Sequence, residues 1–510
     1  MALNHPNGTP PKAIDLSHHL NTLSKSRHPS PLKDIIKFMA YDGMISLSGE
    51  TGLTLVDPLS PADSIPALET KKLRIDSTST PPLAKFLQYG TCEGNAELRQ
   101  WAYNFTAKIH RPAYADFEIL LHPGNTNAWS KLAGLLVEKG DYILTENFTY
   151  PSSQAHWIPH GNFAAPVALD GQGLRADALE EVLSCWDKTH PGVRKPHVLY
   201  MVSVGSNPTG LTMGAERRQA IYDTCVKHDV IIVEDDPYYF IQYPDYKIGG
   251  SKPDHEILPS DKFVESLAPS LLRYDYQGRV IRLESFSKSL APGLRLGYFV
   301  ANPIFTERLL RATEVETQDP SGFSQALVLE LLKAWGDDGY LAWQQRLRIE
   351  YQTRRDWMID AFSSHFDLVP AEQVSGFKGD GIVASLRHAN GSGSTPIFNF
   401  VAPTGGMFIW TRFLLAQNPR FRQLKSDKSV TGPEEKFANE FWSQLAENLI
   451  LLTPGSYYYP WQGGEEATSK VQVVEPDMTY FRFCFSMATE DQMKTGIARF
   501  AEVVKKSWEV

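Results

Sequence analysis

The chain has few cysteines and no long apolar run. Four cysteines occur in 510 residues (Cys92, Cys185, Cys225 and Cys484), and their wide spacing matches neither a disulfide framework nor a metal site. No stretch is apolar for the roughly 20 residues that a membrane-spanning helix needs. The first eight residues also lack the apolar core of a secretory signal. These absences predict a cytoplasmic protein with reduced thiols, no metal and no membrane partner.

The chain has no excess of positive charge either. It contains 50 basic and 59 acidic residues, a net charge of -9, which argues against a nucleic-acid partner. Its length exceeds the roughly 100 to 200 residues of an ordinary domain, so we expect at least two domains.

Strand-like and helix-like segments alternate from about residue 81 to about residue 335. We expect residues 1–80 to form an N-terminal arm and part of a small domain, and residues 81–335 a large α/β domain with a mostly parallel sheet. Residues 336–510 are expected to form a small C-terminal α+β domain that begins with a helix near residues 339–362. The segment 387–396 is rich in Gly and Ser and predicts a mobile surface loop.

Lys288 lies in a segment whose neighbours suit an anion. The strand-like run 279–284 leads into Ser285 and Ser287, and Arg295 follows seven positions after the lysine. Hydroxyl and guanidinium groups donate to phosphate, and an arginine stays charged at any working pH. A lysine amine beside such a site can bond to the aldehyde of pyridoxal phosphate. A basic surface loop is the alternative interpretation.

A carboxylate follows an apolar strand upstream. Residues 230–233 are wholly apolar and β-branched, which is typical of a buried parallel strand, and Asp235 lies just beyond them. Open α/β sheets bind ligands at that end of their strands. A buried carboxylate is costly unless it meets a cation, and the protonated ring nitrogen of pyridoxal phosphate is one. We favour Asp235 over Asp236 for this contact; an acidic turn that caps the next element is the alternative.

Two further strand-like runs end in residues that suit the ring of the same cofactor. Asn207 follows the run 197–204 and can donate to the phenolate oxygen. Tyr150 follows the run 141–146 and can stack on a flat heterocycle. Taken alone, Asn207 is also ordinary turn chemistry and Tyr150 is as consistent with packing.

A turn that opens a helix offers a second group of phosphate donors. Gly124, Asn125 and Thr126 follow the strand-like run 117–121 and precede a helical run. The N-terminus of a helix presents free N–H groups and a positive dipole end to an anion. The glycine patterns of dinucleotide and nucleoside-triphosphate sites are missing, so those cofactors are not indicated.

These motifs occur together and in a familiar order. Asn207-Pro-Thr-Gly210, Asp235-Asp-Pro-Tyr238, Ser285-Phe-Ser-Lys288 with Arg295, and Arg482 resemble the class I and II aminotransferases. The resemblance extends over nearly the whole chain and is closest to the fungal aromatic, 2-aminoadipate and kynurenine aminotransferases. It implies the α/β fold type I of pyridoxal-phosphate enzymes, with the cofactor in the large domain.

The resemblance also implies a role for each site residue. Lys288 would bond to the cofactor and Asp235 would pair with its ring nitrogen. The implied catalytic residues are Lys288, Asp235 and Tyr150. The implied cofactor-binding residues are Lys288, Gly124, Asn125, Thr126, Tyr150, Asn207, Asp235, Tyr238, Ser285, Ser287, Arg295 and Tyr89. The implied substrate-binding residues are Arg482, Asn207, Lys33 and Gly49.

Some of these positions concern the substrate and the partner chain. Tyr89 matches a tyrosine that in relatives reaches the phosphate of the neighbouring subunit, which implies a homodimer with shared sites. Arg482 matches the arginine that grips the substrate α-carboxylate. Lys33 stands where relatives often carry arginine, and Glu50 follows Gly49 where they often carry a second glycine. Because lysine lacks the planar fork of arginine, we expect substrate entry to differ.

The expected reaction moves an amino group from an aromatic amino acid to a 2-oxo acid such as 2-oxoglutarate, by a ping-pong mechanism. Donors such as 2-aminoadipate or kynurenine are the other candidates. Tyr457, Tyr458 and Tyr459 could line an aromatic-accepting pocket, although packing is the commoner use of such a cluster.

Two alternative functions stay open from the sequence. Glu50 is compatible with a lyase on the same fold, acting by β-elimination or decarboxylation. A transcription regulator with an aminotransferase-like part would need a basic helix-turn-helix head. The first 80 residues lack the positive charge and the helical periodicity for one.

Overall fold

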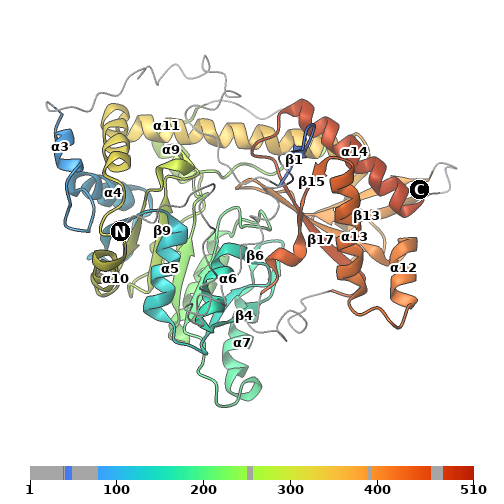
Figure 1. Cartoon of the computed structure of the whole chain (residues 1–510), viewed down its shortest axis with the longest axis horizontal. Coiled ribbons are helices and arrows are strands. Elements are labelled where there is room, and N and C mark those ends of the chain that lie inside the picture. Colours follow the sequence, from blue (N-terminus) through green and yellow to red (C-terminus); the bar gives the residue numbers. More distant parts are fainter. Residues whose placement is uncertain (1–37, 39–40, 49–78, 250–256, 389–392, 461–474) are drawn as a thin grey trace, which may run out of the picture.

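The computed structural model describes residues 38, 41–48, 79–249, 257–388, 393–460 and 475–510 (Figure 1). Lys33, Gly49 and Glu50 lie outside the described residues. So do most of the expected N-terminal arm and positions 389–392 of the expected loop.

A seven-stranded sheet forms the first part of the described chain, in the order β2-β10-β9-β8-β7-β3-β4. Its strands are β2 (Glu118–His122), β3 (Tyr142–Glu146), β4 (Phe163–Val167), β7 (Val198–Met201), β8 (Ile231–Asp235), β9 (Val280–Ser285) and β10 (Gly297–Ala301). Six of these strands run in the same direction, and β10 runs opposite to them. The prediction of a mostly parallel α/β sheet is confirmed.

Helices cover both faces of this sheet, which is why its central strands are largely buried. Every residue of β7, β9 and β10 is buried. Alternate residues of β7 enter two separate hydrophobic cores, with Tyr200 in one and Leu199 in the other. The helices of this part are α3 (Leu83–Phe86), α4 (Ala96–Ile109), α5 (Asn125–Leu136), α6 (Pro151–Trp157), α7 (Ala176–Thr189), α8 (Ala215–Lys227), α9 (Ser260–Glu265) and α10 (Pro303–Glu316).

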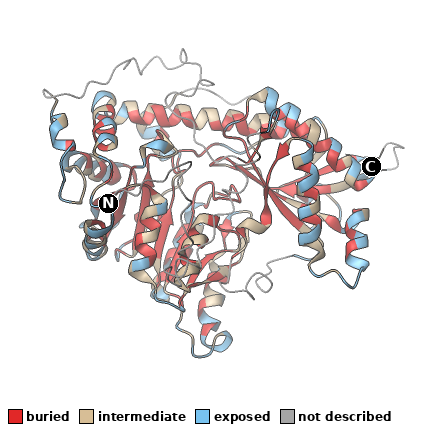
Figure 2. Cartoon of the chain, viewed as in Figure 1, coloured by how far each residue is buried: buried red, intermediate tan, exposed pale blue. Residues whose placement is uncertain are grey.

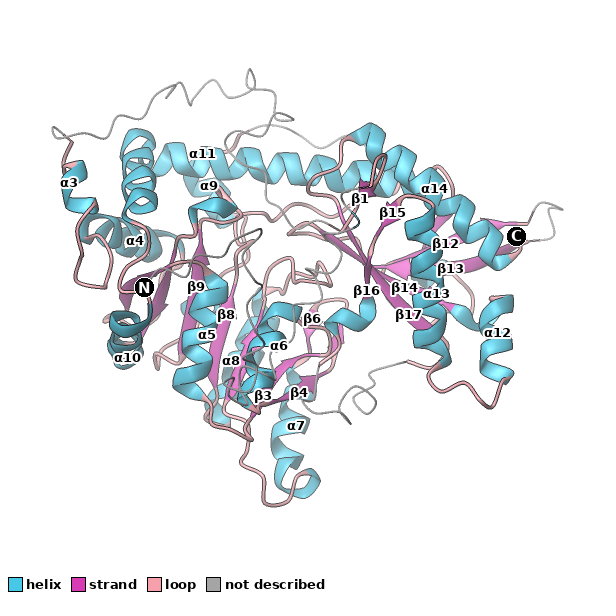
Figure 3. Ribbon diagram, viewed as in Figure 1, coloured by secondary structure: helices cyan, strands magenta, loops and turns pink. Residues whose placement is uncertain are grey.

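A second sheet of six antiparallel strands forms the C-terminal part, in the order β11-β12-β13-β14-β17-β16. The strands are β11 (Asp367–Pro370), β12 (Ile382–Arg387), β13 (Ser394–Phe400), β14 (Phe408–Leu414), β16 (Thr453–Pro454) and β17 (Met478–Cys484). The helices α12 (Pro419–Ser426), α13 (Pro433–Glu447) and α14 (Glu490–Trp508) accompany them. Figure 3 shows the two sheets as separate bodies.

The long helix α11 (Gly322–Ser363) connects the two parts (Figure 1). It contains the helix expected near residues 339–362. Gly336 interrupts it with φ 63° and ψ 177°, so the segment is two helices that meet at a kink. A positive φ costs glycine little, which is why the kink falls at this residue.

Short elements complete the described chain. The paired strands are β1 (Ile45–Ser46) with β15 (Ile450–Leu451), and β5 (Leu169–Asp170) with β6 (Gly173–Leu174). The 3-10 turns are η4 (Ile158–His160), η5 (Leu271–Arg273), η6 (Pro292–Leu294), η7 (Ala371–Gln373), η8 (Leu415–Gln417) and η9 (Gly455–Tyr458). The β1–β15 pair ties the N-terminal residues to the C-terminal part.

Burial follows the sheets and the inner faces of the helices (Figure 2). No helix in the described ranges combines the length and the apolar character that crossing a membrane requires.

Candidate active site

Most of the residues that the sequence singles out lie at one edge of the seven-stranded sheet. Asp235 and Ser285 are the last residues of β8 and β9. Asn207, Tyr150 and Gly124 follow β7, β3 and β2. Because these five strands are parallel to one another, their carboxyl ends meet at the same edge, where α/β sheets hold ligands.

Asp235 is buried there, with 7% of its surface exposed. Its Oδ1 accepts a hydrogen bond from Asn125 Nδ2, and its Oδ2 accepts one from the Tyr200 hydroxyl, both at 2.7 Å. Burial raises the pKa of Asp235 above its ordinary value, while the two hydrogen bonds work against that rise. No lysine, arginine or histidine of the described segments forms an ion pair with this carboxylate. A cation placed against it would relieve the cost of its burial.

Arg295, Ser287 and Gly124 lie together beside this carboxylate. Arg295 Nη1 donates to Ser287 Oγ at 3.1 Å. A Cβ atom on Gly124 would lie 2.1 Å from Arg295 Nη2, so the guanidinium occupies space that only glycine leaves free. Ser285 Oγ accepts from the Ser287 N–H at 3.1 Å. The arrangement joins the two segments that the sequence predicts to share a phosphate.

The first turn of α5 adds open backbone donors. The Gly124 N–H donates to His122 Nδ1 at 3.1 Å, and burial lowers the pKa of His122 to about 3, so this ring is a neutral acceptor. The N–H groups of Asn125 and Thr126 have no protein acceptor in the described segments. Two free N–H groups at a helix N-terminus, next to Arg295, fit a phosphate. The side-chain amide of Asn125 instead donates to Asp235.

Arg482 and Asn207 come from the two different sheets and meet at the same place. Arg482 Nη1 donates to Asn207 Oδ1 at 2.6 Å, across 275 residues of sequence. Its Nη2 donates to Ser48 O at 2.8 Å and to Thr453 Oγ1 at 3.4 Å. The arginine is 0% exposed, and its guanidinium carbon lies 4.3 Å from the Phe408 ring centroid.

An aromatic cluster continues from Arg482. The Tyr458 ring centroid lies 5.2 Å from its guanidinium carbon, and Tyr458 packs edge-on against Trp410 at 5.5 Å. Trp410 stacks on Tyr480 at 5.3 Å and contacts Phe148 at 5.0 Å. Tyr457 and Tyr459 pack against the same cluster. The three tyrosines that could line a pocket or serve in packing therefore belong to one packed cluster, and Tyr458 also borders Arg482.

The remaining residues of the expected site differ in their exposure. Tyr238 is buried and packs edge-on against Phe408 at 5.8 Å, which places it beside Arg482. Lys288 follows Ser287 directly and is half-buried, and Tyr150 precedes α6. Tyr89 is 86% exposed in the single chain.

Asp236 has a different environment from Asp235. It pairs with Arg282 at 3.2 Å, and Arg282 also pairs with Glu234 at 2.8 Å. Glu234 accepts a second ion pair from Arg218 at 3.0 Å. Burial raises the pKa of Asp236 to about 7, whereas Arg282 and Arg218 lower that of Glu234 to about 2. The sequence does not reveal this buried network, because its members are scattered through apolar runs.

Two buried groups next to the site were missed by sequence reasoning. Tyr200 donates to Asp235 and lies inside an apolar strand. Glu146 ends β3, accepts from Ser206 Oγ at 3.0 Å, and has its pKa raised by burial to about 8. Tyr200 on β7 stands opposite Val233, two residues before Asp235 on the same face of β8, so its contact with Asp235 follows only from the strand pairing.

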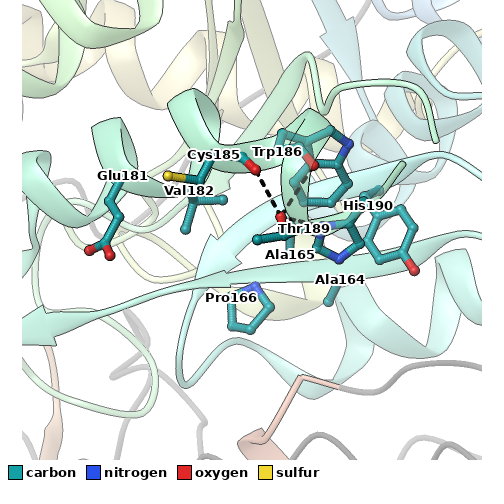
Figure 4. Close-up of a pocket in the computed structure, with 10 residues that line it drawn as sticks. Ala164, Ala165, Pro166, Glu181, Val182, Cys185, Trp186, Thr189 and His190 are labelled. Atoms are coloured by element: carbon teal, nitrogen blue, oxygen red, sulfur yellow. Dashed lines mark hydrogen bonds between the residues drawn. The ribbon is translucent and has the colours of Figure 1, made fainter. Parts of the chain in front are cut away.

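A pocket of about 460 Å³ lies elsewhere, between β4 and α7 (Figure 4). Trp186 and His190 stack in its wall with ring centroids 3.8 Å apart. None of the residues expected to bind cofactor or substrate lines it. Among the described residues no group of three His, Cys, Asp or Glu side chains is placed to hold a metal.

Known proteins resemble the chain over nearly its whole length. The family model "Aminotransferase class I and II" matches residues 80–378. An aromatic amino acid aminotransferase of Schizosaccharomyces pombe is 33% identical over 97% of this chain and 98% of its own length. An L-tyrosine:2-oxoglutarate aminotransferase of Tapinella panuoides is 31% identical, with 97% of both chains covered.

Solved structures agree with these sequences. The crystal structure of aminotransferase Aro8 from Candida albicans matches with a TM-score of 0.72 and 32% identity, over 98% of this chain and 100% of that one. The matching family model and the relatives above 30% identity, with the order of motifs at the sheet edge, establish the family. The chain belongs to the class I and II aminotransferases.

Proposed function

We propose that this aminotransferase binds pyridoxal 5′-phosphate at the carboxyl edge of the seven-stranded sheet and transfers amino groups from aromatic amino acids to 2-oxoglutarate. The observation that carries the proposal is the hydrogen bond from Arg482 to Asn207. It joins the residue expected to grip a substrate carboxylate to the residue expected to contact the cofactor ring.

The residues present fit the cofactor. Asp235 offers a buried carboxylate with no ion-pair partner among the described residues, which suits a protonated ring nitrogen. Asn125 Oδ1 is buried without a hydrogen-bond partner close by. The open N–H groups of Asn125 and Thr126 and the Arg295 guanidinium suit the phosphate.

We assign the holding residues accordingly. Gly124, Asn125, Thr126, Ser285, Ser287 and Arg295 would hold the phosphate, with Tyr89 of a second chain. Asn207 and Tyr238 would contact the phenolate oxygen, and Tyr150 the ring face. Bound pyridoxal phosphate supplies an electron-accepting ring and an aldehyde that bonds to amines.

Lys288 and Arg482 would perform the work on the substrate. The Lys288 amine would bond to the cofactor at rest and, once displaced by the substrate, take the proton from the substrate Cα. Arg482 would fix the substrate by a two-point contact with its α-carboxylate, so that the Cα proton faces the lysine. We also expect Lys33 and Gly49 to contact the incoming substrate.

Aromatic donors are favoured by the relatives and by the surroundings of Arg482. Two relatives carry names that specify aromatic or tyrosine substrates. Phe408, Tyr458 and Trp410 line the neighbourhood of the arginine, and aromatic side chains stack well on such surfaces.

We further propose a cytoplasmic homodimer with shared sites. Tyr89 is 86% exposed in the single chain, and the apolar residues Val315 (83%) and Phe323 (66%) are also exposed. Apolar side chains of this size favour burial against a partner. Within each chain we propose an arm and part of the small domain over residues 1–80, a large domain over 81–335 and a small domain over 336–510.

A donor screen tests the reaction. The purified protein is mixed with pyridoxal phosphate, 2-oxoglutarate and single amino acids, and glutamate formation is followed. Phenylalanine, tyrosine or tryptophan should give the highest kcat/KM, above 2-aminoadipate and kynurenine. Release of ammonia, pyruvate or carbon dioxide without glutamate would instead indicate a lyase.

A further inference from the structure

Tyr200 touches the carboxylate of the candidate site, although nothing in its sequence context marks it. It lies on β7, next to β8, and is 1% exposed. Its hydroxyl donates to Asp235 Oδ2 at 2.7 Å. Burial and the charge of Asp235 raise the pKa of Tyr200 well above its ordinary value, so the hydroxyl stays protonated and can act only as a donor to this carboxylate.

The two oxygens of Asp235 are each held by one neutral donor. Asn125 Nδ2 holds Oδ1 and Tyr200 holds Oδ2, both at 2.7 Å. Donors on both oxygens fix the plane of the carboxylate and favour its charged form, which burial alone disfavours. Arg282 acts on Asp235 electrostatically and lowers its pKa, and Arg282 forms ion pairs with other carboxylates.

The ring of Tyr200 packs between two tryptophans. Trp129 packs on it with ring centroids 4.6 Å apart, and Trp157 contacts it edge-on at 6.5 Å. Trp129 Nε1 also donates to Ser153 O at 3.3 Å, and Ser153 Oγ donates to Tyr150 O at 2.6 Å. Tyr200 is thereby held between Asp235 and the turn that carries Tyr150.

We propose that Tyr200 is a positioning residue of the cofactor site: it fixes the Asp235 carboxylate in the orientation and charge state that bind the ring nitrogen of pyridoxal phosphate. The inference rests on the proposed function. It adds a residue that acts through Asp235 and does not touch the substrate.

The variant Tyr200→Phe tests this, because it removes only the hydroxyl and keeps the ring between the two tryptophans. Tyr222→Phe is the matched control. Tyr222 is also fully buried and its hydroxyl donates to a carboxylate, Asp275 Oδ1, at 3.0 Å, but it lies outside the site. Both variants and the wild type are stripped of cofactor, and the Kd for pyridoxal phosphate is measured by absorbance between pH 5 and 9.

Tyr200→Phe should raise the Kd about tenfold or more, as expected for the loss of a hydrogen bond to a charged group. On acidification, the affinity of the variant for pyridoxal phosphate should begin to fall at a higher pH than that of the wild type. The reason is that Asp235 has lost a donor that favours its charged form. Tyr222→Phe should leave the Kd and its pH profile as in the wild type.

A double-variant cycle with Asp235→Asn shows whether the effect passes through that carboxylate. In the Asp235→Asn background, Tyr200→Phe should change the Kd less than twofold. An undiminished effect in that background overturns the inference, as does a Tyr200→Phe protein that matches the wild type in Kd and pH profile. A wild-type protein that takes up no pyridoxal phosphate overturns the proposed function and this inference together.

Discussion

At the scale of single residues, the site depends on charges placed where burial makes them costly. Asp235 and Arg482 are both buried and lie on different sheets. Each is oriented by neutral partners: Asn125 and Tyr200 for the acid, and Asn207 for the arginine. Groups fixed in this way lose little further freedom when a ligand binds, which favours tight and specific binding.

Replacing Arg482 by lysine should lower kcat/KM for amino donors by about 10- to 100-fold and leave cofactor affinity unchanged. An ammonium cannot donate along two parallel directions, and a charge-assisted hydrogen bond contributes about 1.5 to 3 kcal/mol. Arg412→Lys, on the neighbouring strand and paired with Glu475, is the control. Steady-state kinetics of both proteins measure kcat/KM. Equal losses of kcat/KM in the two variants would contradict the role assigned to Arg482.

Glu146 should make the protein less stable as the pH rises. Burial raises its pKa to about 8, whereas an unfolded glutamate titrates near about 4.3. A carboxyl group with a higher pKa in the folded state favours folding while it is protonated. Its contribution to the free energy of unfolding is therefore lost as the pH rises from the unfolded to the folded pKa, by at most about 1.4 kcal/mol per pH unit.

Glu146→Gln removes this titration and keeps a hydrogen-bond acceptor for Ser206. Urea unfolding of both proteins at pH 5 and pH 8 measures the difference. The variant should gain stability relative to the wild type at pH 8. A difference in unfolding free energy that is the same at both values would show that Glu146 does not titrate in this range.

At the scale of elements, the N-terminus of α5 and the turn before β10 form one unit. Gly124 at the start of the helix leaves the space that the Arg295 side chain fills, and neither segment alone would complete the proposed phosphate site. The contact depends on the absence of a single methyl group.

Gly124→Ala should weaken pyridoxal-phosphate binding about tenfold or more. A Cβ atom would lie 2.1 Å from Arg295 Nη2, and the glycine has φ +102°, which an alanine adopts only with strain. Gly134→Ala on the same helix has nothing within 4 Å of the added atom. It should bind cofactor normally and be more stable by about 0.5 to 1 kcal/mol. Cofactor titration and thermal unfolding test both; similar binding by the two variants would contradict this account.

The strands that carry the site could be predicted from the sequence because their signals are local. The runs 117–121, 141–146, 197–204, 230–233 and 279–284 each contain or overlap an observed strand, and each is a strand-like run followed by a turn. The antiparallel direction of β10 and the kink at Gly336 were not predicted, because the pairing partner of a strand and the packing of a helix are set by distant residues.

The same limit applies inside the site. The sequence motifs predict Lys288, Asp235 and Arg295 as site residues, but they do not predict which side chains donate hydrogen bonds to Asp235. Asn125 was expected at the phosphate, and its side chain instead reaches the carboxylate 110 positions away. Tyr200 lies within an apolar strand, so the sequence pattern does not single it out as a site residue. Contacts of this kind become visible only once strand order and register are known.

At the scale of the whole molecule, the site is assembled from both sheets and, in our proposal, from two chains. Arg482 from the second sheet reaches Asn207 of the first, and Ser48 near the N-terminus joins them. Tyr89 is 86% exposed in the single chain. A second chain would give that side chain a site to complete.

Mixing two impaired variants tests the shared site. In a mixed dimer of Tyr89→Ala and Lys288→Ala, one site would contain both substitutions and the other neither. After subunit exchange, the mixture should therefore show about a quarter of wild-type activity, well above the sum of the separate proteins. Activity that never exceeds that sum would mean that Tyr89 serves the site of its own chain, or none. Sedimentation of the wild type should show a dimer.

The proposed function depends on a covalent bond between the Lys288 amine and pyridoxal phosphate, and borohydride reduction tests that bond most directly. Reduction converts the carbon–nitrogen link into a stable amine, and digestion followed by mass spectrometry locates the label. We predict a pyridoxyl group on Lys288 and no label at position 288 of the Lys288→Ala protein. The turnover of that variant should fall by about 10²- to 10⁴-fold or more. Label on another lysine, such as the exposed Lys262, or a wild-type protein without label, would contradict the account.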